Sequence, residues 1–123
     1  MSVCIAHSST TWPRLATAPR LGISVLAEGQ AAVARRLASR DGGRFDDLPW
    51  EATPSQSVRI KGSAAWLETS VEQVVRAGDH NIVVLRVLDL ELDPDLAPLV
   101  FHGSGFRRLH PGDTPVDGAR NLY

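Results

Sequence analysis

The sequence predicts a mainly β fold with peripheral helices, in the form of a small barrel or sheet. The strongest observation is an apolar run at 80–92, rich in branched and aliphatic residues, which a Gly-Asp turn joins to a second extended segment at 64–76. Further short apolar runs alternate with Gly, Pro, Ser and Thr, which are typical of turns between strands. Only one stretch has a clear helical period.

The composition is that of an ordinary globular domain. The chain has 123 residues, of which 43% are hydrophobic and 22% are charged, and its net charge is −1. This charge balance gives no electrostatic signal for nucleic acid or an acidic membrane, and no segment approaches the roughly 20 apolar residues that span a bilayer. The single cysteine, Cys4, cannot form an internal disulfide. We therefore expect a cytoplasmic protein with no nucleic-acid partner and no membrane partner.

Local patterns predict four elements in the first half of the chain. We expect a strand at Ser2–His7, a short helix at Pro13–Ala18, a strand at Gly22–Leu26 and a longer helix at Glu28–Arg40. Pro13 fits the first turn of a helix, where its missing N–H would have no partner. In the longer helix, Val33 and Leu37 lie four residues apart on one apolar stripe. Glu28 near its start and the arginines near its end complement the helix dipole.

The second half is organised around a long antiparallel hairpin. We expect a connecting segment at Arg44–Ser57, a short edge strand at Val58–Lys61, hairpin arms at Ala64–Arg76 and His80–Leu92, and final strands at Leu99–His102 and Phe106–Leu109. Gly78 and Asp79 close the hairpin, so His80 stands at its mouth. The second arm is apolar on both faces, which means that both faces need a cover. In so small a chain we expect a second subunit to supply it, and hence a homodimer.

Few residues are arranged for chemistry by spacing alone. The histidines, His7, His80, His102 and His110, lack metal-ligand spacing, so we expect no metal site. The hydroxyl run Ser8–Thr11 lies between a strand and a helix start, where it either holds a phosphate or caps the helix. His80 either faces a ligand or is an exposed turn residue. Spacing favours the cap and the exposed turn.

Nearly the whole chain resembles the flavin reductase-like family of FMN-binding split-barrel proteins. The resemblance is carried in order by VCIAHSSTTWPRL at 3–15, LGISVLAEGQAAVARRLASR at 21–40, RFDDLPWE at 44–51, GSAAWLETSVEQVVRAGDHNIVVLRVLDLELD at 62–93 and PLVFHGSGFRRL at 98–109. The Gly-Asp-His at 78–80 before an apolar strand is its most specific element. The resemblance assigns residues 1–109 to a split β-barrel domain that lacks its N-terminal strands, and it leaves 110–123 as a polar tail.

The resemblance also implies an activity and a site. Members of this family are homodimers that bind FMN or FAD between subunits and take electrons from NADH or NADPH. Many of them supply a flavin-dependent monooxygenase. By position, Ser8, Ser9 and Thr11 are expected to bind the flavin. His80 is expected to stand beside the flavin and the nicotinamide as the catalytic residue, and Phe106 to lie near the nicotinamide. Gly103 stands where the family commonly has arginine.

Three functional hypotheses follow. The first is an NAD(P)H-dependent flavin reductase, and the second is a non-catalytic flavin-binding module with the same fold. The third is an inactive fragment, because strands that supply flavin contacts in a usual member are expected to be missing. Oxidation of NADH in the presence of added FMN separates the first hypothesis from the other two. Quenching of FMN fluorescence separates the second from the third.

Overall fold

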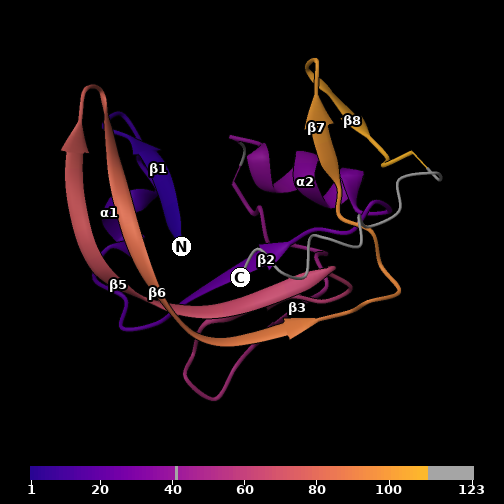
Figure 1. The fold of residues 1–123 in the computed structure, drawn as a ribbon, viewed down its shortest axis with the longest axis horizontal. Coiled ribbons are helices and arrows are strands. Elements are labelled where there is room, and N and C mark those ends of the chain that lie inside the picture. The colour runs from indigo at the N-terminus through magenta and orange to yellow at the C-terminus, as the bar shows by residue number, and fades with distance from the viewer. Residues whose placement is uncertain (41, 111–123) are drawn as a thin grey trace, which may run out of the picture.

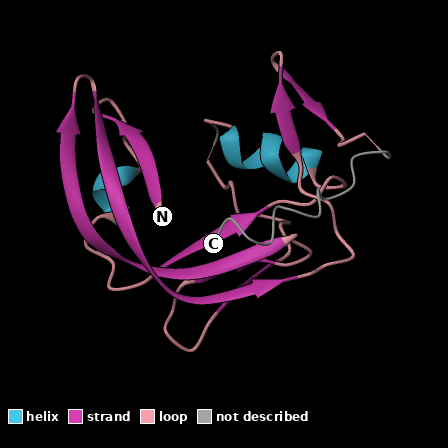
Figure 2. Ribbon diagram, in the orientation of Figure 1, coloured by secondary structure: helices cyan, strands magenta, loops and turns pink. Residues whose placement is uncertain are grey.

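The computed structural model describes residues 1–40 and 42–110, so the predicted tail at 111–123 lies outside the described residues. A four-stranded antiparallel sheet in the order β1-β6-β5-β2 is accompanied by two small sheets, β3-β4 and β7-β8. The elements are β1 (Ser2–Ala6), α1 (Trp12–Leu15), β2 (Leu21–Val25), α2 (Ala31–Ala38), β3 (Trp50–Ala52), β4 (Val58–Ile60), β5 (Ala65–Ala77), β6 (His80–Leu92), β7 (Val100–His102) and β8 (Gly105–Arg107). The predicted mainly β class with peripheral helices is confirmed (Figure 1, Figure 2).

The long hairpin of β5 and β6 is the central feature of the sheet and confirms the predicted pairing. Its register runs from Ala77 opposite His80 to Ala65 opposite Leu92. Gly78 closes the turn with a φ of +64°, which glycine adopts without strain. Two register irregularities interrupt the ladder, and such bulges bend and twist a strand pair. Figure 1 shows both strands curving through the molecule, so that the sheet forms half of a barrel.

Two short strands flank the hairpin on opposite edges and at opposite ends. β1 pairs with the start of β6, and its last residue, Ala6, lies opposite His80. β2 pairs with the start of β5, and Leu21 lies opposite Thr69. The end of β1 is therefore placed beside the hairpin turn. Within the described residues, the distant half of each long strand has no strand partner on its outer edge.

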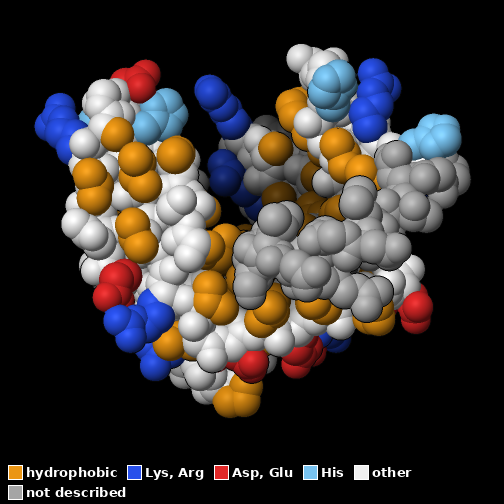
Figure 3. All heavy atoms as spheres, viewed as in Figure 1, with side chains coloured by type: hydrophobic (Ala, Val, Ile, Leu, Met, Phe, Trp, Pro, Cys, Tyr) orange, Lys and Arg blue, Asp and Glu red, His pale blue; other side chains and the backbone are white. Residues whose placement is uncertain are grey.

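The buried core is small and includes residues from both arms of the hairpin. The residues with least exposure are Val83, Thr69, Ser57, Leu85, Ala27, Ile60, Trp66 and Ala64. Val83 and Leu85 come from the apolar run at 80–92 that the sequence singles out, and they are 0% and 2% exposed. Between the two raised sides of the molecule the surface is hollowed, and apolar side chains gather there (Figure 3).

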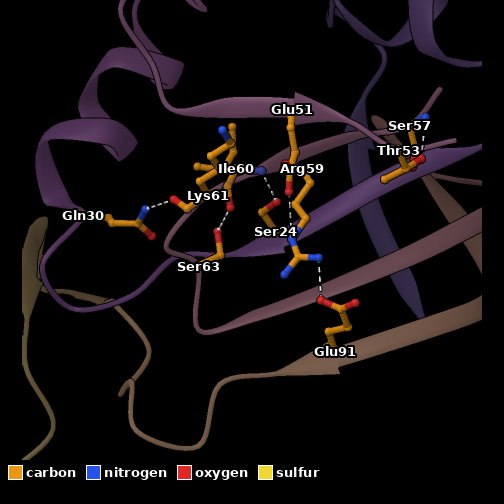
Figure 4. Close-up of polar contacts among 10 residues, drawn as sticks. All are labelled: Ser24, Gln30, Glu51, Thr53, Ser57, Arg59, Ile60, Lys61, Ser63 and Glu91. Carbon is orange, nitrogen blue, oxygen red and sulfur yellow. Dashed lines mark hydrogen bonds and ion pairs between the residues drawn. The ribbon is translucent and has the colours of Figure 1, made fainter.

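Polar contacts join the β3-β4 sheet to the main sheet (Figure 4). The Ile60 N–H donates to Ser24 Oγ at 3.1 Å, which links β4 to β2. Arg59 of β4 forms ion pairs with Glu51 of β3 and with Glu91 of β6. The Ser24 contact thus holds the small sheet against β2, and the Glu91 contact holds it against the part of the hairpin that lies away from the turn.

The structure corrects two predictions about local elements. The segment Arg44–Ser57 is not only a connection, because it contains β3; Pro49 and Pro54 leave too few residues between them for a strand pattern to be visible. The second helix begins at Ala31 rather than at Glu28. The Gln30 side chain holds the preceding residues in a turn, since its Oε1 accepts from the Ala27 N–H at 2.9 Å. The first turn of α2 consequently has no acidic residue.

Gly22 marks a close approach of β4 to β2. A Cβ at this position would lie 1.9 Å from Val58 O. We expect Gly22→Ala to lower the free energy of unfolding by about 2 kcal/mol or more, because β4 would have to move away. Urea unfolding measures this change. Gly29→Ala is the matched control, since its Cβ would meet no atom within 4 Å. Equal effects of the two substitutions would contradict the prediction.

Candidate functional site at the hairpin turn

The loop between β1 and α1 carries three of the predicted site residues. Ser9 fixes its shape, because its N–H donates to Ala6 O at 3.0 Å and its Oγ accepts from the Trp12 N–H at 3.1 Å. Ser9 therefore satisfies the first N–H of α1, although the N-cap position itself belongs to Thr11. Thr11 makes no side-chain capping bond, and Ser8 and Thr11 are exposed. The hydroxyl hydrogen of Ser9 also stays available, because Ser9 Oγ acts as an acceptor in the bond from Trp12.

His7 joins this loop to the hairpin turn. Its N–H donates to Asp79 O at 2.9 Å, and its Nε2 lies 3.1 Å from Asn81 Oδ1. The hydroxyl loop begins at the next residue, Ser8, so the loop and His80 meet at one end of the sheet. The structure thus places the loop that carries Ser8, Ser9 and Thr11 at the same end of the sheet as His80.

His80 is partly exposed and is oriented by its neighbour. Its Nδ1 lies 2.8 Å from Asp79 Oδ1, and 45% of its side chain is exposed. The hydrogen bond from His80, together with the charge of the imidazolium, lowers the pKa of the Asp79 carboxyl below its ordinary value of 3.8. A carboxylate on Nδ1 favours the tautomer whose Nε2 carries a free lone pair. Nε2 of His80 has no partner among the described residues, so in this tautomer it can accept a hydrogen bond from a ligand.

The lowered pKa of Asp79 leads to a prediction about pH and stability. A carboxyl whose pKa falls on folding stabilises the fold above 3.8 and loses this contribution as the pH falls through the lowered value. We expect Asp79→Asn to melt at a lower temperature than the wild type at about pH 7, and the two to converge below pH 3.8. The difference is small, because the Asp79 side chain is 94% exposed. Thermal unfolding across this range measures it, and a gap that persists in acid would contradict it.

The fifth predicted site residue, Phe106, lies elsewhere in the molecule. It belongs to β8, and Figure 1 shows the β7-β8 hairpin on the side of the molecule opposite the β5-β6 turn. Its ring centroid lies 5.4 Å from that of Phe101, and the Arg35 guanidinium lies 5.2 Å from it. Within one chain, Phe106 and His80 therefore do not form a single site.

A large apolar cavity lies beside β1, α1 and β2. Its volume is about 600 Å³, which is in the range of cofactor sites. Trp12, which follows Thr11 directly, forms part of its wall. None of the five predicted site residues lines the cavity. The other lining residues are mostly apolar and come from β1, α1, β2, α2, β4, β6 and the loops between elements: Val3, Ile5, Leu15, Ala18, Arg20, Leu21, Gly22, Ile23, Ser24, Leu26, Leu37, Phe45, Gln56, Ser57, Val58, Ile60 and Leu85.

Sequence reasoning missed three residues that the structure places at these positions. His7 and Asn81 are direct neighbours of Ser8 and His80, but their contact depends on the pairing of β1 with β6, which local patterns do not reveal. Arg35 was noted only for its place near the end of a helix. Among the described residues, no group of three or more His, Cys, Asp and Glu side chains could hold a metal ion. No helix in the described part of the chain is long and apolar enough to cross a membrane.

Comparison with known proteins identifies the family. The family model for the flavin reductase like domain matches residues 1–110. The chain belongs to this family. Its members include a flavin reductase from Pseudomonas putida, to which the chain is 33% identical over 100 residues, covering 81% of the chain and 59% of the relative. The reductase component of 4-hydroxyphenylacetate 3-monooxygenase from Thermus thermophilus is 32% identical over 109 residues, covering 89% of the chain and 68% of the relative.

A solved structure of the family agrees with the fold. The NADH:FAD oxidoreductase of Streptomyces globisporus, in complex with NAD and FAD fragments, superposes with a TM-score of 0.85 at 29% identity, over 92% of this chain and 69% of that one. The predicted split-barrel class is confirmed. The chain spans 57–59% of the length of the flavin reductase from Pseudomonas putida and of a monooxygenase reductase subunit from Rhodococcus jostii.

The residues at the hairpin turn fit a flavin. The available hydroxyls of Ser8, Ser9 and Thr11 can donate to a phosphate or to ring oxygens, and they lie at the start of a helix. The cavity of about 600 Å³, whose wall includes Trp12 but none of these residues, offers an apolar surface for a ring system. His80 adds a polar group with one free nitrogen at the same end of the sheet.

Proposed function

We propose that the protein is an NAD(P)H-dependent flavin reductase acting on FMN or FAD. The proposal rests mainly on one observation. The Ser8–Thr11 loop and His80 lie at the same end of the sheet, in the fold of the flavin reductase family. Relatives support it by their names, among them an NADH-dependent FAD reductase from Streptomyces globisporus that is 32% identical over 114 residues. A flavin in this site supplies the redox chemistry by accepting a hydride, which carries two electrons and one proton, from NAD(P)H.

The roles of the protein's own residues are binding and orientation. Ser8, Ser9 and Thr11 donate hydrogen bonds to the flavin. Asp79 holds His80 in one orientation, so that its Nε2 is aimed at the bound ligands rather than sampling several rotamers. His7 keeps the loop and the turn at a fixed separation, through its bonds to Asp79 and Asn81.

The protein acts as a homodimer in this proposal. Apolar side chains on the hairpin are exposed in the single chain, at 39–69%: Val74, Val75, Val87, Leu88, Leu90 and Leu92. A surface of this kind on a small chain is typical of a subunit interface. A second subunit would also bring Phe106 from one chain towards His80 of the other, which would explain their separation within one chain.

The reduced flavin serves a monooxygenase partner. This part of the proposal is supported by relatives named as reductase components of two-component monooxygenases, among them the Thermus thermophilus protein and the Rhodococcus jostii subunit. A cytoplasmic location fits the single cysteine of the chain, Cys4.

Steady-state kinetics test the proposal. Purified protein with added FMN or FAD should oxidise NADH or NADPH faster than the same concentration of free flavin does. Equal rates over a range of flavin concentrations would overturn the reductase. Quenching of FMN fluorescence without turnover would instead indicate a flavin-binding module, and neither effect would indicate an inactive fragment.

A further inference from the structure

The surface formed by α2 and the β7-β8 hairpin combines an exposed arginine with two aromatic rings, one exposed and one half-buried. The Arg35 guanidinium lies 5.2 Å from the centroid of the Phe106 ring. Phe101 packs against Phe106 at 5.4 Å with an interplanar angle of 60°, and Phe101 is 67% exposed. Arg35 itself is exposed at the C-terminal end of α2. We call these three residues the Arg35–Phe106 patch.

The elements that carry the patch have positively charged side chains and no negatively charged ones. α2 and the β7-β8 hairpin contain Arg35, Arg36 and Arg107 but no aspartate or glutamate, although the whole chain has a net charge of −1. Arg36 is engaged with Gly43 O at 3.1 Å. Arg35, in contrast, has no carboxylate partner among the described residues, and its guanidinium lies against the Phe106 ring. An unpaired guanidinium held against an aromatic ring offers both a charge and a flat apolar face.

Such a combination matches a ligand that carries phosphate and an aromatic ring. A guanidinium binds phosphate oxygens with two parallel N–H donors, and bases stack on exposed aromatic side chains. FMN and a nicotinamide dinucleotide both have this chemistry. The hydroxyl loop Ser8–Thr11 already offers donors for the flavin at the β5-β6 turn, whereas the Arg35–Phe106 patch lies on the other side of the chain.

We propose that Arg35 binds a phosphate group of the nicotinamide dinucleotide, with Phe106 contacting one of its rings. This inference rests on the proposed function and assigns Arg35 as a determinant of electron-donor affinity. The guanidinium comes from α2, so it supplies a cation that the loop at 102–106 lacks. Because the contact is exposed, its strength depends on ionic strength.

Substitutions at Arg35 test the inference in two measurements. Arg35→Ala should raise the KM for NADH about tenfold at saturating flavin and leave kcat within about twofold, since one charge-assisted hydrogen bond is lost. Arg35→Lys should recover part of the loss, because it keeps the charge without the planar fork. Direct titration of NADH fluorescence with protein should show the same order of dissociation constants without turnover. The wild-type KM should rise with salt more steeply than that of Arg35→Ala.

Arg40→Ala is the matched control, because it removes the same charge just beyond the same helix and has no recorded ring contact. It should leave the KM for NADH unchanged. An unchanged KM in Arg35→Ala, or an equal rise in both variants, would overturn the inference. So would a weaker FMN affinity with an unaltered affinity for NADH, because the patch would then serve the flavin. If the wild type binds NADH without oxidising it, the titration still decides this inference while the proposed reductase fails.

Discussion

Replacing His80 by alanine is expected to lower kcat/KM for flavin-dependent NADH oxidation by about 100-fold. His80 is the only described imidazole at the hairpin turn that is held by a carboxylate and keeps a free Nε2. Removing it deletes a positioned ring nitrogen from the proposed ligand site. The hydroxyl loop is untouched, so FMN affinity should change by less than about threefold. Steady-state kinetics and FMN fluorescence titration separate the two effects.

The matched control for this substitution is Arg76→Ala, an exposed change on β5 near the same turn. It should leave kcat/KM within about twofold of the wild type. A His80→Ala variant that keeps its thermal midpoint and its full kcat/KM would show that His80 is only an exposed turn residue. A large loss in FMN affinity would assign His80 to flavin binding rather than to the reaction.

Replacing Leu90 by glutamate is expected to dissociate the proposed homodimer. Leu90 and Leu92 alternate along β6, so they lie on one face of the strand. They are 50% and 69% exposed in the single chain, and Leu88, at a register irregularity, is 43% exposed. A carboxylate in the centre of this face would be buried without a partner in the dimer. We expect the dissociation constant of the dimer to rise by about 100-fold. Turnover should fall with it, because Phe106 of one subunit would no longer lie near His80 of the other. Analytical ultracentrifugation over a concentration series measures the first effect.

Leu109→Glu makes the same chemical change at a leucine that is 48% exposed and lies outside the hairpin. It should remain dimeric. If both variants are dimers, the β6 face is not the subunit interface. If the wild type is a monomer, the proposed homodimer is wrong. Because Leu90 is exposed in the single chain, the fold of Leu90→Glu should persist, which circular dichroism checks.

The elements that could be predicted from the sequence are those with a strong local pattern. The β5-β6 hairpin follows from β-branched residues on both sides of Gly78-Asp79, and β1 and β2 follow from short apolar runs. The start of α2 could not be predicted from composition, because the turn before it depends on a hydrogen bond from the Ala27 N–H to the Gln30 side chain. β3 was missed because a three-residue strand between prolines has no period to detect.

The sequence singled out individual candidate residues, but it could not predict how they are arranged in space. The resemblance singled out Ser8, Ser9, Thr11 and His80, yet only the pairing of Ala6 with His80 places them at one end of the sheet. That pairing joins segments more than 70 residues apart, which no local pattern encodes. The contact between Arg35 and Phe106 is of the same kind, since it joins a helix to a strand far along the chain. The residues that sequence reasoning missed are therefore those whose role depends on long-range contacts.

The most direct test of the reductase account is an anaerobic single-turnover measurement. Protein with bound flavin is mixed rapidly with NADH or NADPH, and the loss of the oxidised-flavin absorbance is followed over time. The account predicts bleaching that is faster than with free flavin, saturates with nucleotide concentration and slows by about 100-fold in His80→Ala. Bleaching at the rate of free flavin, with the same rate in wild type and His80→Ala, would contradict it.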